Sequence, residues 1–162
     1  MEKIILNFNY WIDILYKKKL LKLIFWSKID DFIKKFWKET HISTNTYTKL
    51  YDKIYYFCNN SLQICVNNNI IYWIEISYDI WCKVMFLDKS IFNTKVDDLI
   101  SYINKYYKYD KKDPWLWNSF IFHDIGLSLR RENKPQDFKK DLWENEYQKW
   151  VYFNTVRLWK ST

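Results

Sequence analysis

The hydrophobic positions in the first third of the chain repeat every three or four residues, which is the period of an amphipathic helix. Residues 10–26 show this spacing on both sides of the lysines at 17–19. Ser27 follows as a candidate N-cap, and an apolar stripe continues behind it from residue 29 to residue 37. A third stripe lies between residues 47 and 57. The pattern therefore predicts that the N-terminal third is helical.

Between residues 62 and 87 the period changes from helical to alternating. Residues 62–66, 70–77 and 81–87 are rich in β-branched and aromatic side chains, which is typical of strands. Asparagines occupy positions 67–69, and asparagine tolerates the left-handed conformations that tight turns require. We therefore expect an antiparallel meander here. Its middle strand is apolar on both faces, so helices are expected to cover at least one face.

The C-terminal half resumes the helical period, with one further strand inside it. A fourth helix is predicted from residue 93 or 94, and Pro114 lies beyond its end. Residues 119–129 have the pattern of a long strand, bent at Gly126. Pro135 opens a last predicted helix, whose apolar stripe ends at Leu158.

This order of elements defines an α+β fold class. We expect an antiparallel sheet of about four strands packed against helices, with a helical N-terminal third and a long C-terminal helix. The length of 162 residues corresponds to one domain. Because no repeat or linker interrupts the chain, residues 1–162 are predicted to form a single α+β domain.

The composition excludes several classes of protein. The chain has one glycine, and loops that cradle phosphates need glycines for close backbone approach, so Walker-type and dinucleotide-binding loops are excluded. No apolar run is long enough to span a bilayer, and the N-terminus lacks the apolar stretch of a signal peptide. We therefore expect a cytoplasmic protein with no membrane insertion and no cofactor.

The three cysteines do not form a recognisable site in the sequence. Cys58, Cys65 and Cys82 are odd in number and lack C-x-x-C spacing, so they indicate neither a disulfide framework nor a zinc site. His41 and His123 lie far from them along the chain. We predict that the cysteines are buried as small hydrophobic residues and that no metal is bound.

A few acidic and histidine residues are candidates for catalysis. His123 and Asp124 are neighbours, as in some metal-dependent phosphohydrolases, but on a strand their side chains would point to opposite faces. Glu75, Asp79 and Lys83 lack the spacing of a nuclease metal site. We therefore predict no catalytic residues. A degenerate or active metal-dependent nuclease-like protein is kept as the second alternative.

Basic and aromatic residues interleave after the fourth predicted helix. The net charge of +7 favours an acidic partner. Single strands bind such surfaces through contacts of lysine with phosphate and of rings with bases. A nucleic-acid-binding protein, for single-stranded or structured nucleic acid, is therefore the first alternative. Its candidate residues are Lys105, Tyr106, Tyr107, Lys108, Lys111 and Lys112.

Tryptophan and arginine residues flank the predicted strand 119–129. Trp115 and Trp117 precede it, and Arg130 and Arg131 follow it. These residue types dominate the hot spots of protein interfaces, and Pro114 would stiffen the segment that presents the rings. We therefore predict that these four residues bind a partner protein.

The function that we favour from the sequence is that of a non-enzymatic inhibitor or neutraliser, which acts by occluding a partner protein. The chain contains no alanine and is rich in lysine, asparagine, isoleucine and tyrosine, which indicates an AT-rich gene. Small accessory genes of that kind include those for toxin-immunity proteins and phage anti-defence proteins. We expect a function of this type.

Overall fold

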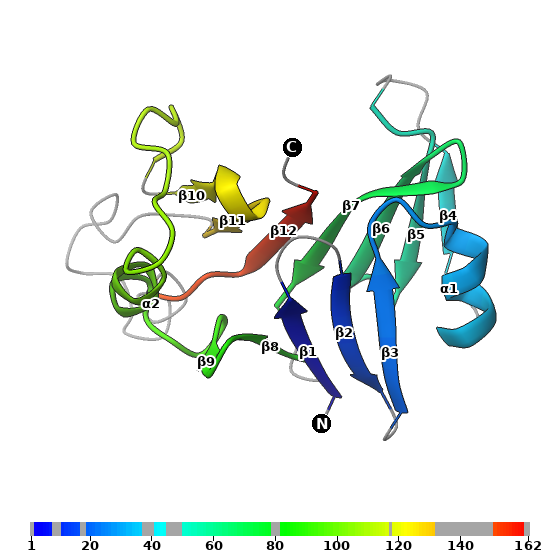
Figure 1. Ribbon diagram of the computed structural model, residues 1–162, viewed down its shortest axis with the longest axis horizontal. Helices are drawn as coiled ribbons and strands as arrows, with labels where there is room; N and C mark the ends of the chain where they lie inside the picture. Colours follow the sequence, from blue (N-terminus) through cyan, green and yellow to red (C-terminus); the bar gives the residue numbers. More distant parts are fainter. Residues whose placement is uncertain are drawn as a thin grey trace, which may run out of the picture.

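Strands dominate the structure of this protein. The computed structural model describes residues 2–7, 11–16, 19–36, 41–44, 50–78, 82–116, 118–131 and 151–160. Within these ranges the strands form one five-stranded sheet and one seven-stranded sheet (Figure 1). The α+β prediction with about four strands is therefore wrong, because 46% of the structure is strand and only 16% is helix.

The smaller sheet contains the first strands of the chain. Its order is β3-β2-β1-β8-β9, with β1 parallel to β8 and the other neighbours antiparallel. The strands are β1 (Glu2–Asn7), β2 (Trp11–Tyr16), β3 (Lys19–Ile24), β8 (Cys82–Phe86) and β9 (Lys89–Ser90). The helix predicted over 10–26 is thus wrong, because short apolar runs fit either period and here pairing with β1 selects the strand.

The larger sheet is antiparallel throughout. Its order is β10-β11-β12-β7-β6-β5-β4. The strands are β4 (His41–Thr44), β5 (Lys53–Phe57), β6 (Leu62–Asn67), β7 (Ile70–Ser77), β10 (Ser119–Phe122), β11 (Leu127–Arg130) and β12 (Thr155–Trp159). The predicted strands at 62–66 and 70–77 are confirmed, and the strand predicted over 81–87 is present as β8. The meander of all three is wrong, because β8 pairs with β1 in the smaller sheet and not with β7. Between β6 and β7, Asn68 and Asn69 have φ angles of 50° and 67°, as the turn prediction requires.

Two further predicted helices are wrong where the structure describes them. Residues 53–57 form β5, not part of a helix over 47–57. Residues 155–159 form β12, although the last helix was predicted to reach Leu158. In β12 Val156 and Leu158 are buried and Arg157 is exposed, which is the alternation of a strand. The rest of that predicted helix, residues 135–150, lies outside the described residues.

The predicted long strand over 119–129 is a hairpin. β10 ends at Phe122, a single 3₁₀ turn (η1, His123–Ile125) follows, and β11 begins at Leu127. Gly126 closes the turn with φ 56° and ψ 47°, a left-handed conformation that glycine adopts without the penalty of a Cβ. The predicted bend at Gly126 is therefore a complete reversal of the chain.

Two α-helices are present among the described residues, and both were predicted. They are α1 (Ile29–Phe36) and α2 (Val96–Ile103), which lie at opposite ends of the molecule in Figure 1. Neither is long and apolar enough to cross a membrane. α2 buries four apolar side chains in the core.

One hydrophobic core joins the two sheets. It includes Leu23, Val84 and Phe86 of the smaller sheet and Ile64 and Ile74 of the larger. The inward face of the larger sheet is therefore covered. Its opposite face, which we call the outer face, carries the polar and half-buried side chains of the same strands.

Candidate functional site

A row of paired residues crosses the whole outer face of the larger sheet. Because side chains alternate along a strand, the residues paired in one row share a face. None of this row is buried, whereas the residues before and after it on the central strands are. From β10 to β4 the row is Ile121, Ser128, Arg157, Glu75, Gln63, Tyr56 and His41.

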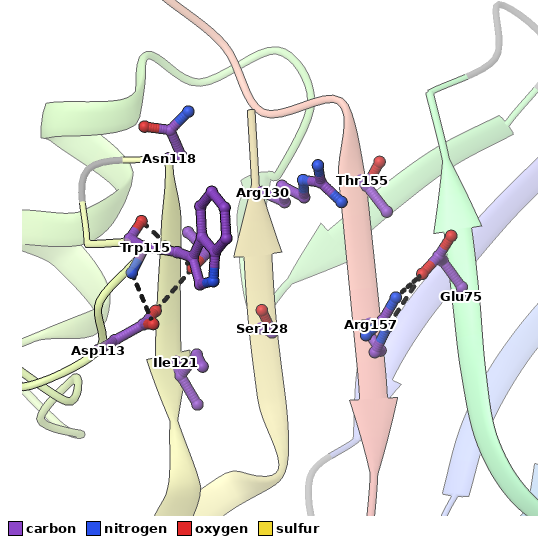
Figure 2. Close-up of a pocket in the computed structure, with 10 residues that line it drawn as sticks. Glu75, Asp113, Trp115, Asn118, Ile121, Ser128, Arg130, Thr155 and Arg157 are labelled. Atoms are coloured by element: carbon purple, nitrogen blue, oxygen red, sulfur yellow. Dashed lines mark hydrogen bonds and ion pairs between the residues drawn. The ribbon is translucent and has the colours of Figure 1, made fainter. Parts of the chain in front are cut away.

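A pocket of about 410 Å³ opens at the β10 end of this row. Strands β10, β11, β12 and β7 form its floor, and the turn before β10 forms one wall (Figure 2). Ten residues line it: Glu75, Asp113, Trp115, Asn118, Ser119, Ile121, Ser128, Arg130, Thr155 and Arg157. The pocket thus combines an apolar ring with both positive and negative groups, at the lower end of the size range of ligand pockets.

The wall of the pocket is a β-turn whose residues follow from the sequence. Asp113 occupies the first position and Pro114 the second, the residues that type I turns prefer there. The amide of Leu116 donates to the Asp113 carbonyl at 3.0 Å, which closes the turn. Asp113 is 8% exposed, and its carboxylate accepts hydrogen bonds from the Trp115 amide at 3.0 Å and the Ser119 hydroxyl at 2.6 Å. One buried carboxylate therefore ties the turn to β10.

This turn presents Trp115 to the solvent. The Trp115 side chain is 71% exposed, the highest value among the exposed large hydrophobic residues that the structure describes. Figure 2 shows its ring beside β10 and β11, while the Arg130 side chain extends from β11 towards β12. Arg130 is exposed, and its guanidinium makes no hydrogen bond or ion pair with the described residues. The rim thus offers an aromatic ring and a cation, both available for contact.

The opposite wall is a fixed ion pair between β12 and β7. Arg157 donates from Nη2 and Nε to the same Glu75 oxygen, Oε2, at 2.7 and 2.9 Å. The Arg157 guanidinium also lies over the Trp73 ring at 4.6 Å, and the Tyr51 ring meets Trp73 edge-on at 5.8 Å. The charge of Arg157 is therefore already balanced, and its position is set by contacts on two sides.

The structure brings together two of the four predicted partner-binding residues. Trp115 and Arg130 line the same pocket. Arg131 does not share it: the side chain is 6% exposed, and its amide donates to the Asn118 carbonyl at 2.8 Å. Trp117 lies outside the described residues. At the end of a strand, adjacent side chains point to opposite faces. Only one residue of the Arg130–Arg131 pair can therefore reach the outer face.

The predicted nucleic-acid segment follows α2 and presents few rings. Tyr106 is 60% exposed, but Tyr107 is half-buried against the core. Lys105, Lys111 and Lys112 are exposed. Lys108 is also exposed, and its Nζ donates to the Asn104 carbonyl at 2.6 Å. The segment therefore supplies several cations but one well-exposed ring.

The candidate acid–base residues are dispersed. The His123 Nε2 lies 3.3 Å from Asp110 Oδ2, not against Asp124, and both His123 and Asp124 are exposed. The pKa of Asp110 is lowered, mainly by the backbone amide of Lys112 and then by His123. Asp79 lies outside the described residues. Among the residues that the structure describes, no three His, Cys, Asp or Glu side chains come together as metal ligands.

One cysteine of the larger sheet is buried on the outer face, where it pairs with Trp73 across β6 and β7. Cys65 is fully buried on β6, and burial raises the pKa of its thiol well above the usual range, an effect that nearby Glu75 increases. Cys58 is half-buried. Burial is thus confirmed for Cys65, while the side chain of Cys82 lies outside the described residues.

Sequence reasoning missed three residues of the pocket. Asp113 could have been found, because an Asp-Pro pair is a turn signal. In the sequence, Glu75 is a candidate metal ligand, and nothing there relates it to Arg157. Arg157 was hidden because residue 157 fell inside a predicted helix, where it has no relation to Glu75.

Comparisons with known proteins add no relative. The chain matches no protein-family model, no curated protein and no solved structure. What the pocket can bind therefore follows from its own side chains: a ring that offers large contact area, a guanidinium without a partner in the described part of the chain, and a wall made of an ion pair.

Proposed function

We propose that this protein is a non-enzymatic binding protein that inhibits or neutralises a partner protein, with the pocket on the outer face as its contact site. The observation that carries the proposal is the exposed Trp115 ring in the same pocket as Arg130, whose guanidinium has no partner among the described residues. A tryptophan that is 71% exposed leaves most of its apolar surface in water. A partner that covers the ring removes this surface from water, which is favourable and costs little side-chain entropy.

Preorganisation supports the same function. The Asp113 carboxylate and Pro114 hold the backbone that carries Trp115, so little conformational freedom is lost when a partner binds. Tryptophan and arginine are the residue types most enriched in interface hot spots. A small number of such residues on a stiff turn is enough to anchor an occluding protein.

Nucleic-acid binding is the rival function, and one observation favours it. Tyr106 is 60% exposed among the exposed Lys105, Lys111 and Lys112, on a chain of net charge +7. One ring stacked on a base contributes roughly 1–3 kcal/mol, so this segment would bind a single strand weakly and mainly through charge. Its binding would then fall steeply with salt.

The test of the proposed function is affinity purification of the tagged full chain from the cells that encode it. We expect a protein partner whose retention falls by about tenfold or more in Trp115→Ala, as for an interface hot spot. Tyr106→Ala removes a ring of similar exposure elsewhere and is expected to retain the partner. Loss with Tyr106→Ala but not with Trp115→Ala, together with salt-sensitive binding to oligonucleotides, would establish the rival instead.

A further inference from the structure

The charged groups that line the pocket are engaged to different degrees. Glu75 and Arg157 neutralise each other at 2.7 Å. Asp113 is buried and directs its carboxylate at an amide and a hydroxyl of its own turn. Arg130 alone among these four lacks a side-chain partner within the described part of the chain. Its guanidinium therefore has all its donors available for an incoming acceptor.

The balance of charge favours a singly charged ligand. Two acidic and two basic side chains line the pocket, so its local field is close to neutral. A phosphate dianion would bring two charges to Arg130, because Arg157 is already paired with Glu75, so the second charge would lose its water without gaining a counter-charge. A carboxylate carries a single charge and matches the planar fork of a guanidinium with two parallel hydrogen bonds.

The backbone of the pocket argues against capture of a chain terminus. A terminal carboxylate is usually held by a nest of free backbone amides. Here the described amides of the turn are already used, since Trp115 donates to Asp113 and both Asn118 and Ser119 donate to the Trp115 carbonyl at 3.0 and 2.8 Å. The side chain of Arg130 is thus the charged donor on offer among the described lining residues, which suits an acidic side chain.

An apolar group would lie next to that carboxylate. The Trp115 ring and the Ile121 side chain line the same pocket. A volume of about 410 Å³ is large enough for a short peptide segment and is much larger than an isolated ion needs. The ligand that fits both surfaces is an acidic residue followed or preceded by a large apolar one.

We infer that the pocket binds an aspartate or glutamate side chain of the partner protein at Arg130, with the neighbouring apolar side chain packed on Trp115. The inference rests on the proposed function and specifies the chemistry of its partner. The positive net charge of the chain would also steer an acidic partner towards it.

The experiment uses small blocked peptides on the full ¹⁵N-labelled chain. The probe is acetyl-Glu-Phe-amide, and the matched control is acetyl-Gln-Phe-amide, which keeps the shape and removes the charge. Two further probes separate the other sources of negative charge: acetyl-Phe with a free carboxyl terminus, and inorganic phosphate. Binding is followed through the Trp115 indole and Arg130 Nε resonances.

We expect saturable chemical-shift changes with the glutamate peptide. The dissociation constant of the glutamine peptide should be larger by about fivefold or more. Arg130→Gln should weaken the glutamate peptide to the level of the glutamine peptide, and Arg130→Lys should give an intermediate value because it keeps the charge and loses the fork. Lys112→Gln removes the same charge from another exposed site and should leave binding unchanged.

Three results would overturn the inference. They are equal affinity for the glutamate and glutamine peptides, unchanged binding in Arg130→Gln, or tighter binding of phosphate or of the free terminus. If partner retention still depends on Trp115 while the charge of the peptide does not change its affinity, the inferred carboxylate contact is wrong and the proposed function stands. If Trp115→Ala retains the partner fully, the proposed function fails by itself.

Discussion

The Asp113 carboxylate is predicted to be the main support of the pocket wall. Asp113→Ala removes one buried acceptor and leaves two donors, the Trp115 amide and the Ser119 hydroxyl, without it. Hydrogen bonds to charged groups contribute about 1.5–3 kcal/mol each. Because the turn lies near the surface, water can hydrogen-bond to the two donors and offset part of the lost stability. We expect the free energy of unfolding to fall by about 2–4 kcal/mol.

A conservative series separates hydrogen bonding from charge and shape. Asp113→Asn keeps one oxygen for the Trp115 amide and can donate its NH₂ to the Ser119 oxygen, so we expect a loss of about 1 kcal/mol. Ser119→Ala removes only one of the two bonds and should also cost about 1 kcal/mol. Asp124→Ala, an exposed aspartate on the β10–β11 connection, is the control and should stay within about 0.5 kcal/mol of the parent.

The assay is urea unfolding followed by tryptophan fluorescence, with the midpoint and the slope fitted separately. A changed midpoint with an unchanged slope assigns the effect to the native state. The reasoning would be refuted if Asp113→Ala lay within about 0.5 kcal/mol of the parent, or if Asp113→Asn were as damaging as Asp113→Ala.

Three further predictions concern the surroundings of the pocket. Gly126→Ala should lower the free energy of unfolding by about 1–2 kcal/mol in the same urea assay, because a Cβ is disfavoured at φ 56°, and an unchanged midpoint would contradict this. In the folded protein at pH 8, DTNB should label Cys58 well before Cys65, because Cys65 is fully buried and its thiol pKa is raised, and equal rates measured by peptide mapping would count against it. The hydroxyl of Tyr102 donates a hydrogen bond to the Asp88 carboxylate at 2.6 Å, and this bond is the main reason that the pKa of Asp88 lies below 3.8. The stability that this gives is present above pH 3.8 and is lost as the pH falls through the lower folded-state value, so Asp88→Asn should flatten the decline of the urea midpoint in acid, whereas parallel declines would argue against the contact.

Short-range chemistry made several local structures predictable from the sequence. Asn68 and Asn69 marked the β6–β7 turn because asparagine tolerates positive φ, and the alternating strands on either side formed as predicted. The apolar stripe of α2 was also sufficient, since its four buried positions have helical spacing. In the candidate site, residue type alone singled out Trp115 and Arg130.

Which short apolar runs became strands depended on their neighbours in the folded sheet. Residues 155–159 fit either period, and they form β12 because β7 and β11 provide hydrogen-bonding partners on both sides. That insertion places Arg157 opposite Glu75, which lies 82 positions earlier in the chain, and so builds the second wall of the pocket. Pairing between strands so distant in sequence depends on the packing of the whole sheet, because a single strand leaves its hydrogen-bonding groups unsatisfied until its neighbours are in place.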